Sequence, residues 1–369
     1  MTEPSGLARE ELWLYSRQIV LDEIGLEGQE KLKKSRVLVA GVGGLGTPIT
    51  LQLTAMGVGH LRVVDRDIIS MSDLHRQYLY DVSSVGLPKV EVAASKLSAL
   101  NPRVNIEPVP ISIRHWNVKD LLEQIDVVID GLDSVEARYL INRACVKLGI
   151  PYVYGGAVRT EGMVSTIMPR RTPCLECFQP NLKDEDLPKC AVVGVYTPLI
   201  GIVASIEVSE TIRLLTGKQP KLAGRLLFID ASTLSFDEIT LAHHEKCPIC
   251  SDTVKPPSPL TEKQIEEQCS RDGRTTLVIT PQEWLEIDLA AVRDHIVELG
   301  YSEDRRGRLG LTATNEKGLT VGLLKTGVAI FQIPPSRASS NMHREALALY
   351  EELQVLMHTS SKEVYLRYK

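Results

Sequence analysis

A glycine-rich turn near the start of the chain has the composition of a phosphate-binding loop. It reads Gly41-Val42-Gly43-Gly44-Leu45-Gly46, and it joins the apolar segment Arg36–Ala40 to a helical segment. Glycines let the backbone approach a phosphate, and the N-terminus of a helix offers N–H groups and a positive dipole. Asp65 ends the next apolar segment, 19 residues after Gly46, where a carboxylate can accept ribose hydroxyls. These residues predict a nucleotide site.

The glycine loop alone fits a nicotinamide dinucleotide as well as ATP, and helix–strand packing could also require its glycines. A dense polar series after the second apolar segment distinguishes the two nucleotides. The series consists of Asp67, Ser72, Asp73, Arg76 and Lys89. Two cations beside a phosphate loop suit the charge that develops on phosphoryl oxygens, whereas hydride transfer does not need them. Taken as a set, the series favours ATP, although either cation alone would be better explained as solvated surface charge.

Further carboxylates follow the apolar segment Asp126–Asp130. Asp130 and Asp133 lie at its carboxyl end, and Ser134 comes next. Mg²⁺ is usually held by one or two carboxylates together with phosphate oxygens. We therefore expect Mg²⁺ beside the ATP at this position.

Four of the seven cysteines form two C-x-x-C pairs, Cys174/Cys177 and Cys247/Cys250, with 69 residues between the pairs. Four thiolates with this spacing suit a closed, tetrahedral and structural Zn²⁺ site. The alternative is a set of free buried cysteines, which two complete pairs make less attractive. Because the total is odd, a disulfide framework is not expected. The metal would hold the segment around Cys247 and Cys250 against the catalytic domain that contains Cys174 and Cys177.

Cys190 stands apart from these pairs. It follows the acidic, proline-containing segment Asn181–Lys189 and precedes a long apolar helix. An isolated thiol in such a place is a candidate nucleophile, and the alternative is an incidental half-buried cysteine. Lys189 would favour the thiolate, whereas Asp184 and its acidic neighbours would oppose it.

Alternating strand and helix patterns position all of these residues. Short apolar runs alternate with amphipathic helices up to Tyr154, which predicts an α/β fold with a doubly wound, mainly parallel sheet. Antiparallel pieces then follow around a helix near Pro198–Leu215. The expected units are an N-terminal helical arm (1–35), an ATP-binding domain with the zinc site and the Cys190 loop (36–250), a linker (251–273) and an α+β domain (274–369).

Size and charge narrow the classes of function. A chain of 369 residues exceeds the usual size of one hydrophobic core, so one large and one small domain are expected. A net charge of −5 offers no global attraction for nucleic acid. The N-terminus lacks a secretory signal, and the most apolar stretch is too short to span a bilayer. We therefore expect a cytoplasmic protein that binds neither nucleic acid nor membranes.

Several motifs together resemble the ubiquitin-activating superfamily, over roughly Leu12–Cys250. They are YSRQ (Tyr15–Gln18), GVGGLG, VDRDIISMSDLHRQ (Val64–Gln77), GLPK (Gly86–Lys89) and DGLDSVEAR (Asp130–Arg138). The chain looks most similar to the small homodimeric adenylyltransferases of the molybdopterin-synthase and thiamine-biosynthesis type, which have a Rossmann-like fold.

The resemblance implies roles for individual residues. Gly43, Asp65, Ser72, Arg76, Lys89 and Asp133 would contact ATP or its Mg²⁺, and Arg17 would reach the nucleotide site of a partner subunit. The family joins the C-terminal glycine carboxylate of a ubiquitin-fold protein to AMP and releases pyrophosphate. One departure is Asp73, where the family usually has Asn, because a carboxylate there would repel phosphate unless a cation balances it.

The leading reading is adenylation of a ubiquitin-like protein ending in Gly-Gly, followed by a thioester with Cys190. The alternative is a sulfur-carrier adenylyltransferase that stops at the acyl-adenylate. A nicotinamide oxidoreductase and an inactive zinc scaffold explain less of the sequence. The C-terminal segment Arg274–Lys369 contains no cysteine, so it is not a cysteine-based sulfurtransferase. It is expected to recruit a protein such as a conjugating enzyme or the modifier.

Overall fold

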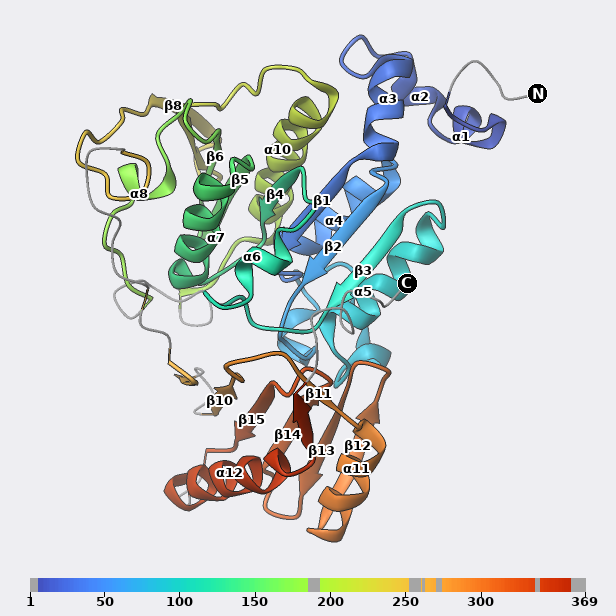
Figure 1. Cartoon of the computed structure of the whole chain (residues 1–369), viewed down its shortest axis with the longest axis vertical. Helices are drawn as coiled ribbons and strands as arrows, with labels where there is room; N and C mark the ends of the chain where they lie inside the picture. The colour runs from blue at the N-terminus through green and yellow to red at the C-terminus, as the bar shows by residue number, and fades with distance from the viewer. Residues whose placement is uncertain are drawn as a thin grey trace.

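The structure is a computed structural model that describes residues 6–184, 193–251, 260, 263–269, 274–335 and 339–359. The described chain begins with a helical arm (Figure 1). The arm consists of α1 (Arg9–Leu14), α2 (Ser16–Ile19) and α3 (Gly25–Lys34). It lies at the amino end of the sheet, since Gln18 and Gln29 both donate to the backbone oxygen of Met56, at the end of α4 (Gly46–Ala55).

An eight-stranded sheet follows, in the order β3-β2-β1-β4-β5-β6-β7-β8. The first five strands in this order, β3-β2-β1-β4-β5, are parallel to one another, and β6, β7 and β8 each pair antiparallel with the strand before them. The predicted fold class is therefore confirmed. The bounds are β1 (Arg36–Ala40), β2 (His60–Val64), β3 (Asn105–Val109), β4 (Val127–Asp130), β5 (Tyr152–Val158), β6 (Glu161–Ile167), β7 (Arg225–Asp230) and β8 (Ser235–Thr240). Strand β8 was not predicted, because its residues are mostly polar and show no alternation of apolar and polar side chains.

Helices cover both faces of this sheet. Val37 and Val39 of β1 pack toward α4, α5 (Lys89–Leu100) and α10 (Thr197–Thr216). Leu38 and Ala40 pack toward α6 (Val118–Leu121) and α7 (Val135–Leu148). Successive residues of a strand point to opposite faces, so a strand covered on both sides must be apolar throughout, as RVLVA largely is. Short elements complete this part: η1 (Met71–Asp73), η2 (Val82–Ser84) and α8 (Leu175–Phe178).

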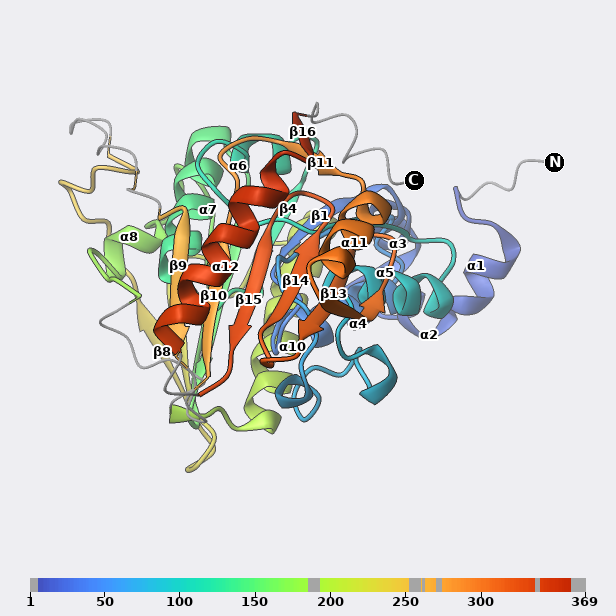
Figure 2. The same ribbon diagram turned by 90° about the horizontal axis from the view of Figure 1, so that it is seen from below.

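The C-terminal unit is a six-stranded antiparallel sheet with helices on one face (Figure 2). Its strand order is β12-β13-β14-β15-β10-β9. Its elements are β9 (Ile265–Cys269), β10 (Thr275–Ile279), β11 (Leu285–Ile287), α11 (Leu289–Glu298), β12 (Tyr301–Arg306), β13 (Gly310–Asn315), β14 (Thr320–Leu324), β15 (Ala329–Ile333), α12 (Ser339–Gln354) and β16 (Met357–Thr359). A hairpin turn at Lys325–Gly327 joins β14 to the antiparallel β15, and Gly327 adopts φ +81° in it.

Two sequence expectations need correction here. The segment 251–273 is not all linker, because Ile265–Cys269 forms the edge strand β9 and pairs with β10. The residue pattern of Pro281–Leu299 predicts one helix over that whole range, but the helix begins at Leu289, where Asp288 caps it by accepting from the N–H of Ala290 at 2.8 Å. The residues before the cap form β11.

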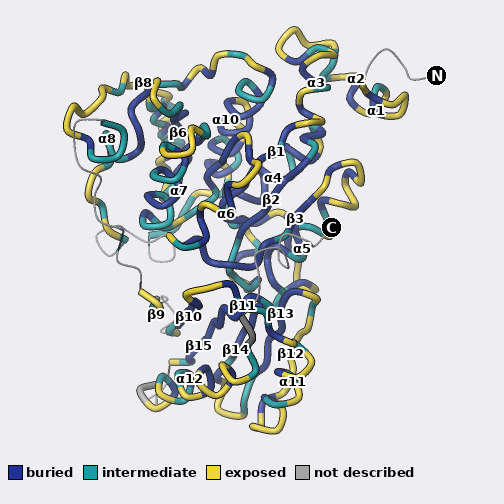
Figure 3. Tube along the Cα trace, in the orientation of Figure 1, coloured by how far each residue is buried: buried dark blue, intermediate teal, exposed yellow. Residues whose placement is uncertain are grey.

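The second face of the C-terminal sheet packs against the adenylation domain. Val278, Leu324 and Ile330 belong to the same apolar cluster as Leu38 of β1. Trp284 meets Trp116 edge to face, with ring centroids 5.5 Å apart. Buried chain runs continuously from the large sheet into the C-terminal sheet (Figure 3). The two units therefore share a core, whereas the predicted linker suggested a tethered module.

Candidate nucleotide site and zinc centre

The glycine loop forms a tight turn between β1 and α4. Gly41 has φ +89°, and a Cβ there would lie 2.6 Å from the oxygen of Gly131. A Cβ on Gly46 would lie 2.0 Å from the oxygen of Gly41. Packing of the turn therefore requires both glycines. A Cβ on Gly43 would meet nothing nearer than Gln77 Nε2, at 3.8 Å, so this glycine leaves open space beside the backbone. Gly44 lies against Ile200 of α10.

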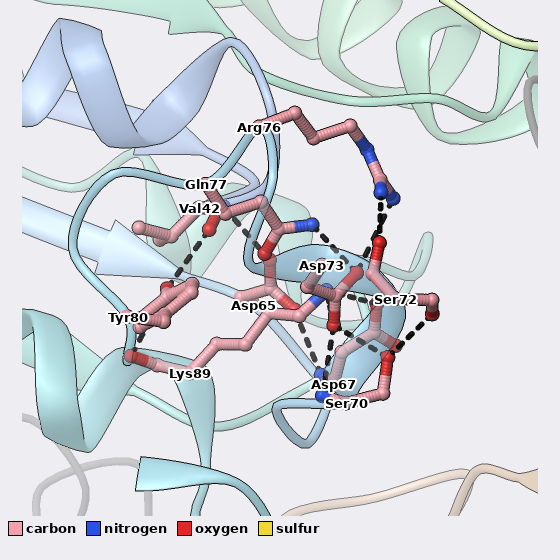
Figure 4. A network of polar contacts seen from close by, with 10 residues as sticks. All are labelled: Val42, Asp65, Asp67, Ser70, Ser72, Asp73, Arg76, Gln77, Tyr80 and Lys89. Atoms are coloured by element: carbon pink, nitrogen blue, oxygen red, sulfur yellow. Dashed lines mark hydrogen bonds and ion pairs between the residues drawn. The ribbon is translucent and has the colours of Figure 1, made fainter. Parts of the chain in front are cut away.

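Carboxylates that follow β2 surround a buried lysine (Figure 4). Asp65 accepts from the N–H of Val42 at 2.7 Å, which ties the end of β2 to the glycine loop. The Nζ of Lys89 lies 3.0 Å from Asp67 Oδ2 and 3.9 Å from Asp73 Oδ2. Burial opposes the charge on Lys89, but the carboxylates of Asp67, Asp65 and Asp73 raise its pKa well above the ordinary value. The ammonium group is therefore a permanent charge at the edge of the loop.

Asp65 should make nucleotide binding depend on pH. Burial and the charge of Asp67 raise the pKa of Asp65 to about 6. A neutral carboxyl is a poor acceptor for ribose hydroxyls, so affinity should be highest above pH 6. Because about a tenth of the group is ionised one pH unit below its pKa, we expect ATP affinity to fall about tenfold between pH 7.5 and 5. Calorimetric titration with Mg–ATP measures this change.

The matched control for this prediction is Asp65→Asn. Its affinity should be weaker at pH 7.5 and should vary only with the protonation of ATP itself. A pH profile of Asp65→Asn that parallels the wild-type profile would show that another group is responsible.

Asp73 is engaged within its own loop. Its Oδ1 accepts from Gln77 Nε2 at 2.9 Å and from Arg76 at 3.2 Å, and its Oδ2 accepts from the N–H and hydroxyl of Ser70 at 2.9 Å. Two cations, Arg76 and Lys89, therefore face this carboxylate. The repulsion toward phosphate that the sequence raised is balanced by these charges. Exposed Ser72 holds Arg76 through its backbone oxygen, at 2.6 Å.

Sequence reasoning missed two residues that shape this site. Gln77 is 2% exposed, and its Oε1 has no hydrogen-bond partner among the described residues. This orphaned acceptor beside Gly43 fits a site that a polar ligand completes. Tyr80 is buried, and its hydroxyl donates to the backbone oxygen of Val42 at 2.9 Å. Gln77 is the last residue of the motif that contains Arg76, and Tyr80 follows three residues later; this proximity was their only sequence signal.

The two carboxylates expected to share Mg²⁺ have different environments. Asp130 is fully buried, and its Oδ2 accepts from Tyr152 at 2.6 Å and Arg138 at 3.0 Å. The N–H of Leu132 also donates to Oδ1, at 2.8 Å, so both oxygens of Asp130 are already engaged and it is less available to Mg²⁺ than an exposed carboxylate. Asp133 is exposed at the end of β4, and its charge acts on Arg66 and Arg138. It keeps the position expected of a magnesium ligand.

Ser134 begins helix α7 instead of pointing freely at a ligand. Its hydroxyl accepts from the N–H of Ala137 and donates to Asp184 Oδ2 at 2.7 Å. Asp184 also accepts from the N–H of Val135 at 2.6 Å. Asp184 is therefore anchored at the N-terminus of α7. Cys190 itself lies outside the described residues.

Arg17 does not lie with the other predicted nucleotide-binding residues. It is exposed on α2, whose neighbour Gln18 contacts the C-terminal end of α4. The glycine loop is at the opposite end of this helix, about 15 Å away for ten residues. Within one chain Arg17 cannot complete the site, which leaves a role in a partner subunit as a prediction.

The four paired cysteines come together at one point between α8 and the segment after β8. Their sulfurs all lie within 4.8 Å of one another. The distances are 3.9 Å for Cys174–Cys177, 3.6 Å for Cys174–Cys247 and 3.3 Å for Cys177–Cys250. Tetrahedral Zn–S bonds of about 2.3 Å place sulfurs about 3.8 Å apart, so the residues fit zinc. Without a cation, burial raises the pKa of Cys250 to about 12. A bound Zn²⁺ would stabilise the thiolate and lower this pKa again.

The fold and these sites define a class: a doubly wound α/β protein with a nucleotide loop and a four-cysteine staple. The family model described as the ThiF family matches residues 15–249. The chain belongs to the ThiF family, which confirms the resemblance seen in its motifs.

Named relatives support the enzyme class. The sulfur carrier protein adenylyltransferase of Thermus thermophilus is 40% identical over 250 residues, which cover 66% of this chain and 92% of the relative. The SAMP-activating enzyme E1 of Haloferax volcanii is 41% identical and covers 64% and 88%. The adenylyltransferase and sulfurtransferase MOCS3 of Culex quinquefasciatus is 39% identical, and the match spans 60% of its length. The predicted adenylyltransferase class is confirmed, and these names favour the sulfur-carrier alternative over the thioester reading.

Solved structures agree on the fold. The crystal structure of E. coli MccB matches with a TM-score of 0.60 at 20% identity, over 70% of this chain and 77% of that one. This likeness concerns the fold alone. In the described part of the chain, no helix combines the length and apolar character needed to cross a membrane.

Proposed function

We propose that this enzyme uses Mg–ATP to adenylate the C-terminal glycine of a ubiquitin-fold sulfur carrier or modifier ending in Gly-Gly. The observation that carries the proposal is Lys89, a buried cation at the edge of an open glycine loop, held 3.0 Å from Asp67. A fixed cation in this place suits phosphoryl transfer. The family membership and the names of the relatives support the same reaction.

The proposed reaction is a displacement at the α-phosphorus. A carboxylate oxygen of the carrier's terminal glycine forms a new bond to phosphorus, and the bond to the bridging oxygen of pyrophosphate breaks. Negative charge moves onto the departing pyrophosphate, so fixed positive charge lowers the barrier. Mg²⁺ would neutralise part of this charge, with Asp133 as the exposed carboxylate available to hold it.

The chain's own residues would share the binding of ATP. Gly43 leaves room for a phosphate beside the backbone, and Asp65 would accept the ribose hydroxyls. Lys89 and Arg76 would contact the phosphate oxygens. Arg76 now rests on Asp73, at 3.2 Å, and it would exchange part of that contact for the nucleotide.

We infer that a second copy of the chain supplies Arg17. The arm around it exposes large apolar side chains, with Trp13 84% and Val20 77% exposed. Exposed apolar surface of this kind is typical of a protein interface. A homodimer would cover the arm and bring Arg17 to the partner's nucleotide site.

ATP–pyrophosphate exchange tests the proposed reaction. Labelled pyrophosphate should enter ATP only when a carrier ending in Gly-Gly is added, since the reverse of adenylation needs the acyl-adenylate. A carrier truncated by its last glycine is the matched control. Absence of exchange with every Gly-Gly protein tried, despite ATP binding, would refute the proposal.

The same mixture shows whether the carrier passes from the adenylate to a cysteine of the enzyme. On a non-reducing gel, a thiol-labile carrier adduct that disappears in Cys190→Ala would support transfer to Cys190. We expect exchange without such an adduct, because the relatives favour an enzyme that stops at the adenylate.

A further inference from the structure

The segment that follows β2 has two faces with different partners. Asp65 and Asp67 face the glycine loop, where they contact Val42 and Lys89 (Figure 4). The two residues between and after them, Arg66 and Ile68, face the C-terminal sheet. Alternation of this kind is what an extended backbone produces. One side of the segment therefore belongs to the nucleotide site and the other to the C-terminal unit.

Close contacts fix the second face. The guanidinium of Arg66 donates two parallel hydrogen bonds of 2.7 Å to the carboxylate of Glu266, on β9. Ile68 lies against Gly322 of β14, where a Cβ would come within 2.1 Å of Ile68 Cδ1. A bidentate arginine–carboxylate pair is directional as well as strong. The C-terminal unit thus determines where the backbone of this segment lies.

The C-terminal unit also contacts the residues on either side of Lys89. A Cβ on Gly310 would lie 2.8 Å from Pro88 Cγ. Glu91 accepts from the N–H groups of Arg308 and Leu309, at 2.7 and 2.8 Å. The C-terminal sheet therefore lies directly behind both Asp67 and Lys89. We call this part of the C-terminal sheet, which contacts Arg66, Ile68, Pro88 and Glu91, the wall of the site. The ThiF match ends at residue 249, so the wall lies outside the region that the family model covers.

Glu266 is a partly buried residue of this wall with two arginine partners, and it is not an incidental surface charge. Its side chain is 22% exposed, and it also contacts Arg114, whose side chain is 7% exposed. Burial opposes its ionisation, but Arg66 and Arg114 lower the pKa of Glu266 to about 2. The unit has other attachments away from Arg66, including the hydrogen bond between Ser112 and Thr280, at 2.8 Å, and the Trp116–Trp284 contact.

We propose that Glu266 is a positioning residue for the nucleotide site. By holding Arg66, it holds the flanking carboxylates of Asp65 and Asp67 in register with the glycine loop, so the C-terminal unit is required for tight binding of ATP. The inference rests on the proposed function in taking ATP as the ligand.

The test compares full-length variants by calorimetric titration with Mg–ATP, without any carrier. Glu266→Gln keeps the shape of the side chain but removes its charge, and we expect the Kd for ATP to rise about tenfold because the carboxylates lose their register. Arg66→Gln should have the same effect. The double variant should be no worse than either single variant, since both remove one interaction. Ser112→Ala, which removes an interface hydrogen bond elsewhere, should bind ATP within about twofold of wild type.

Tryptophan fluorescence separates positioning from docking. In a Trp13→Phe background, the remaining tryptophans, Trp116 and Trp284, both lie at the interface. An unchanged spectrum together with weakened ATP binding in Glu266→Gln supports the proposal. Equal ATP affinity in Glu266→Gln and wild type overturns it. A spectrum showing separation of the units also overturns it, because Glu266 would then be needed for docking itself.

These outcomes are distinct from failure of the proposed function. Wild-type protein that binds ATP but supports no exchange with any carrier would refute adenylation and leave the Glu266 comparison valid. Normal wild-type exchange with no effect of Glu266→Gln would refute the positioning role alone.

Discussion

Replacing Lys89 with Met should lower the rate of ATP–pyrophosphate exchange by about 10²–10³-fold, the usual effect of losing one group that stabilises transition-state charge. Lys89 is 5% exposed, and its carboxylate neighbours keep it charged. Met has a similar length and no charge, so packing is largely kept while the cation is lost. Exchange measured at saturating ATP and carrier gives the effect on the chemical step.

Loss of folding must be separated from loss of chemistry in this variant. Lys89→Met leaves Asp67 and Asp73 without their shared cation, which should reduce stability as well. Adding Asp67→Asn removes one of the uncompensated charges, so the double variant should regain thermal stability without regaining exchange. Lys96→Met, two turns further along α5, removes an exposed lysine paired with Asp81 and should change neither. Exchange by Lys89→Met within tenfold of wild type would refute the assigned role.

The Lys89 variant also tests the contribution of a second subunit. Arg17→Ala and Lys89→Met should each be nearly inactive as homodimers. Mixed dimers would contain one intact site, in which wild-type Lys89 meets wild-type Arg17 from the other chain. Recovery of up to about a quarter of wild-type exchange on mixing, as random pairing predicts, would support the arrangement. No recovery in dimers shown to exchange subunits would exclude it.

Replacement of Cys247, one of the four clustered cysteines that fit zinc, should have the largest effect on stability. Cys247 is 1% exposed, and its sulfur lies 3.6 Å from that of Cys174. Zinc would join the segment after β8 to α8 across 69 residues of chain. Because the large sheet has its own core, the loss should be smaller than the 10–16 kcal/mol typical of zinc-folded peptides. We expect Cys247→Ala to lose bound zinc and to unfold about 10 °C lower.

Metal analysis and calorimetry measure the two parts of this prediction. Cys145→Ala is the matched control, because Cys145 is equally buried but lies in α7 away from the four-sulfur cluster. It should keep one zinc per chain. Near 20 °C, Cys247→Ala should retain most of its exchange activity, since no cysteine of the cluster lies in the nucleotide site. Full zinc content in Cys247→Ala would contradict the four-cysteine site.

Local features of the chain were predictable because short-range physics determines them. The turn at Gly41–Gly46 needs residues without side chains, and β1 needs apolar residues on both faces. The regular alternation of strands and helices then brings the carboxyl ends of β1, β2 and β4 to one edge of the sheet. For these reasons the sequence alone could predict that Asp65 lies beside the glycine loop, and its cysteine spacing predicted the cluster of four sulfurs.

The surroundings of a carboxylate in the folded chain distinguish acidic residues that look equivalent as candidate ligands in the sequence. Asp130 and Asp133 are three positions apart and are the same residue type. Asp130 is buried, and both of its carboxylate oxygens accept hydrogen bonds, whereas Asp133 is exposed. Asp73 likewise looked like a source of repulsion until its cationic neighbours were seen. These differences depend on which side chains the remaining elements bring close, and no short window of sequence contains that information.

The sequence by itself determined the family, the tight glycine turn and the clustering of the paired cysteines, since each is encoded by residue type and spacing within one or two elements. Only the tertiary structure decided what stands behind the site. Glu266 reaches Arg66 across 200 positions of chain, through an edge strand that the sequence pattern assigned to a linker. Pairings between such distant segments are selected by the packing of whole sheets. The C-terminal unit, which was expected to be tethered by a linker, therefore packs directly behind Asp67 and Lys89.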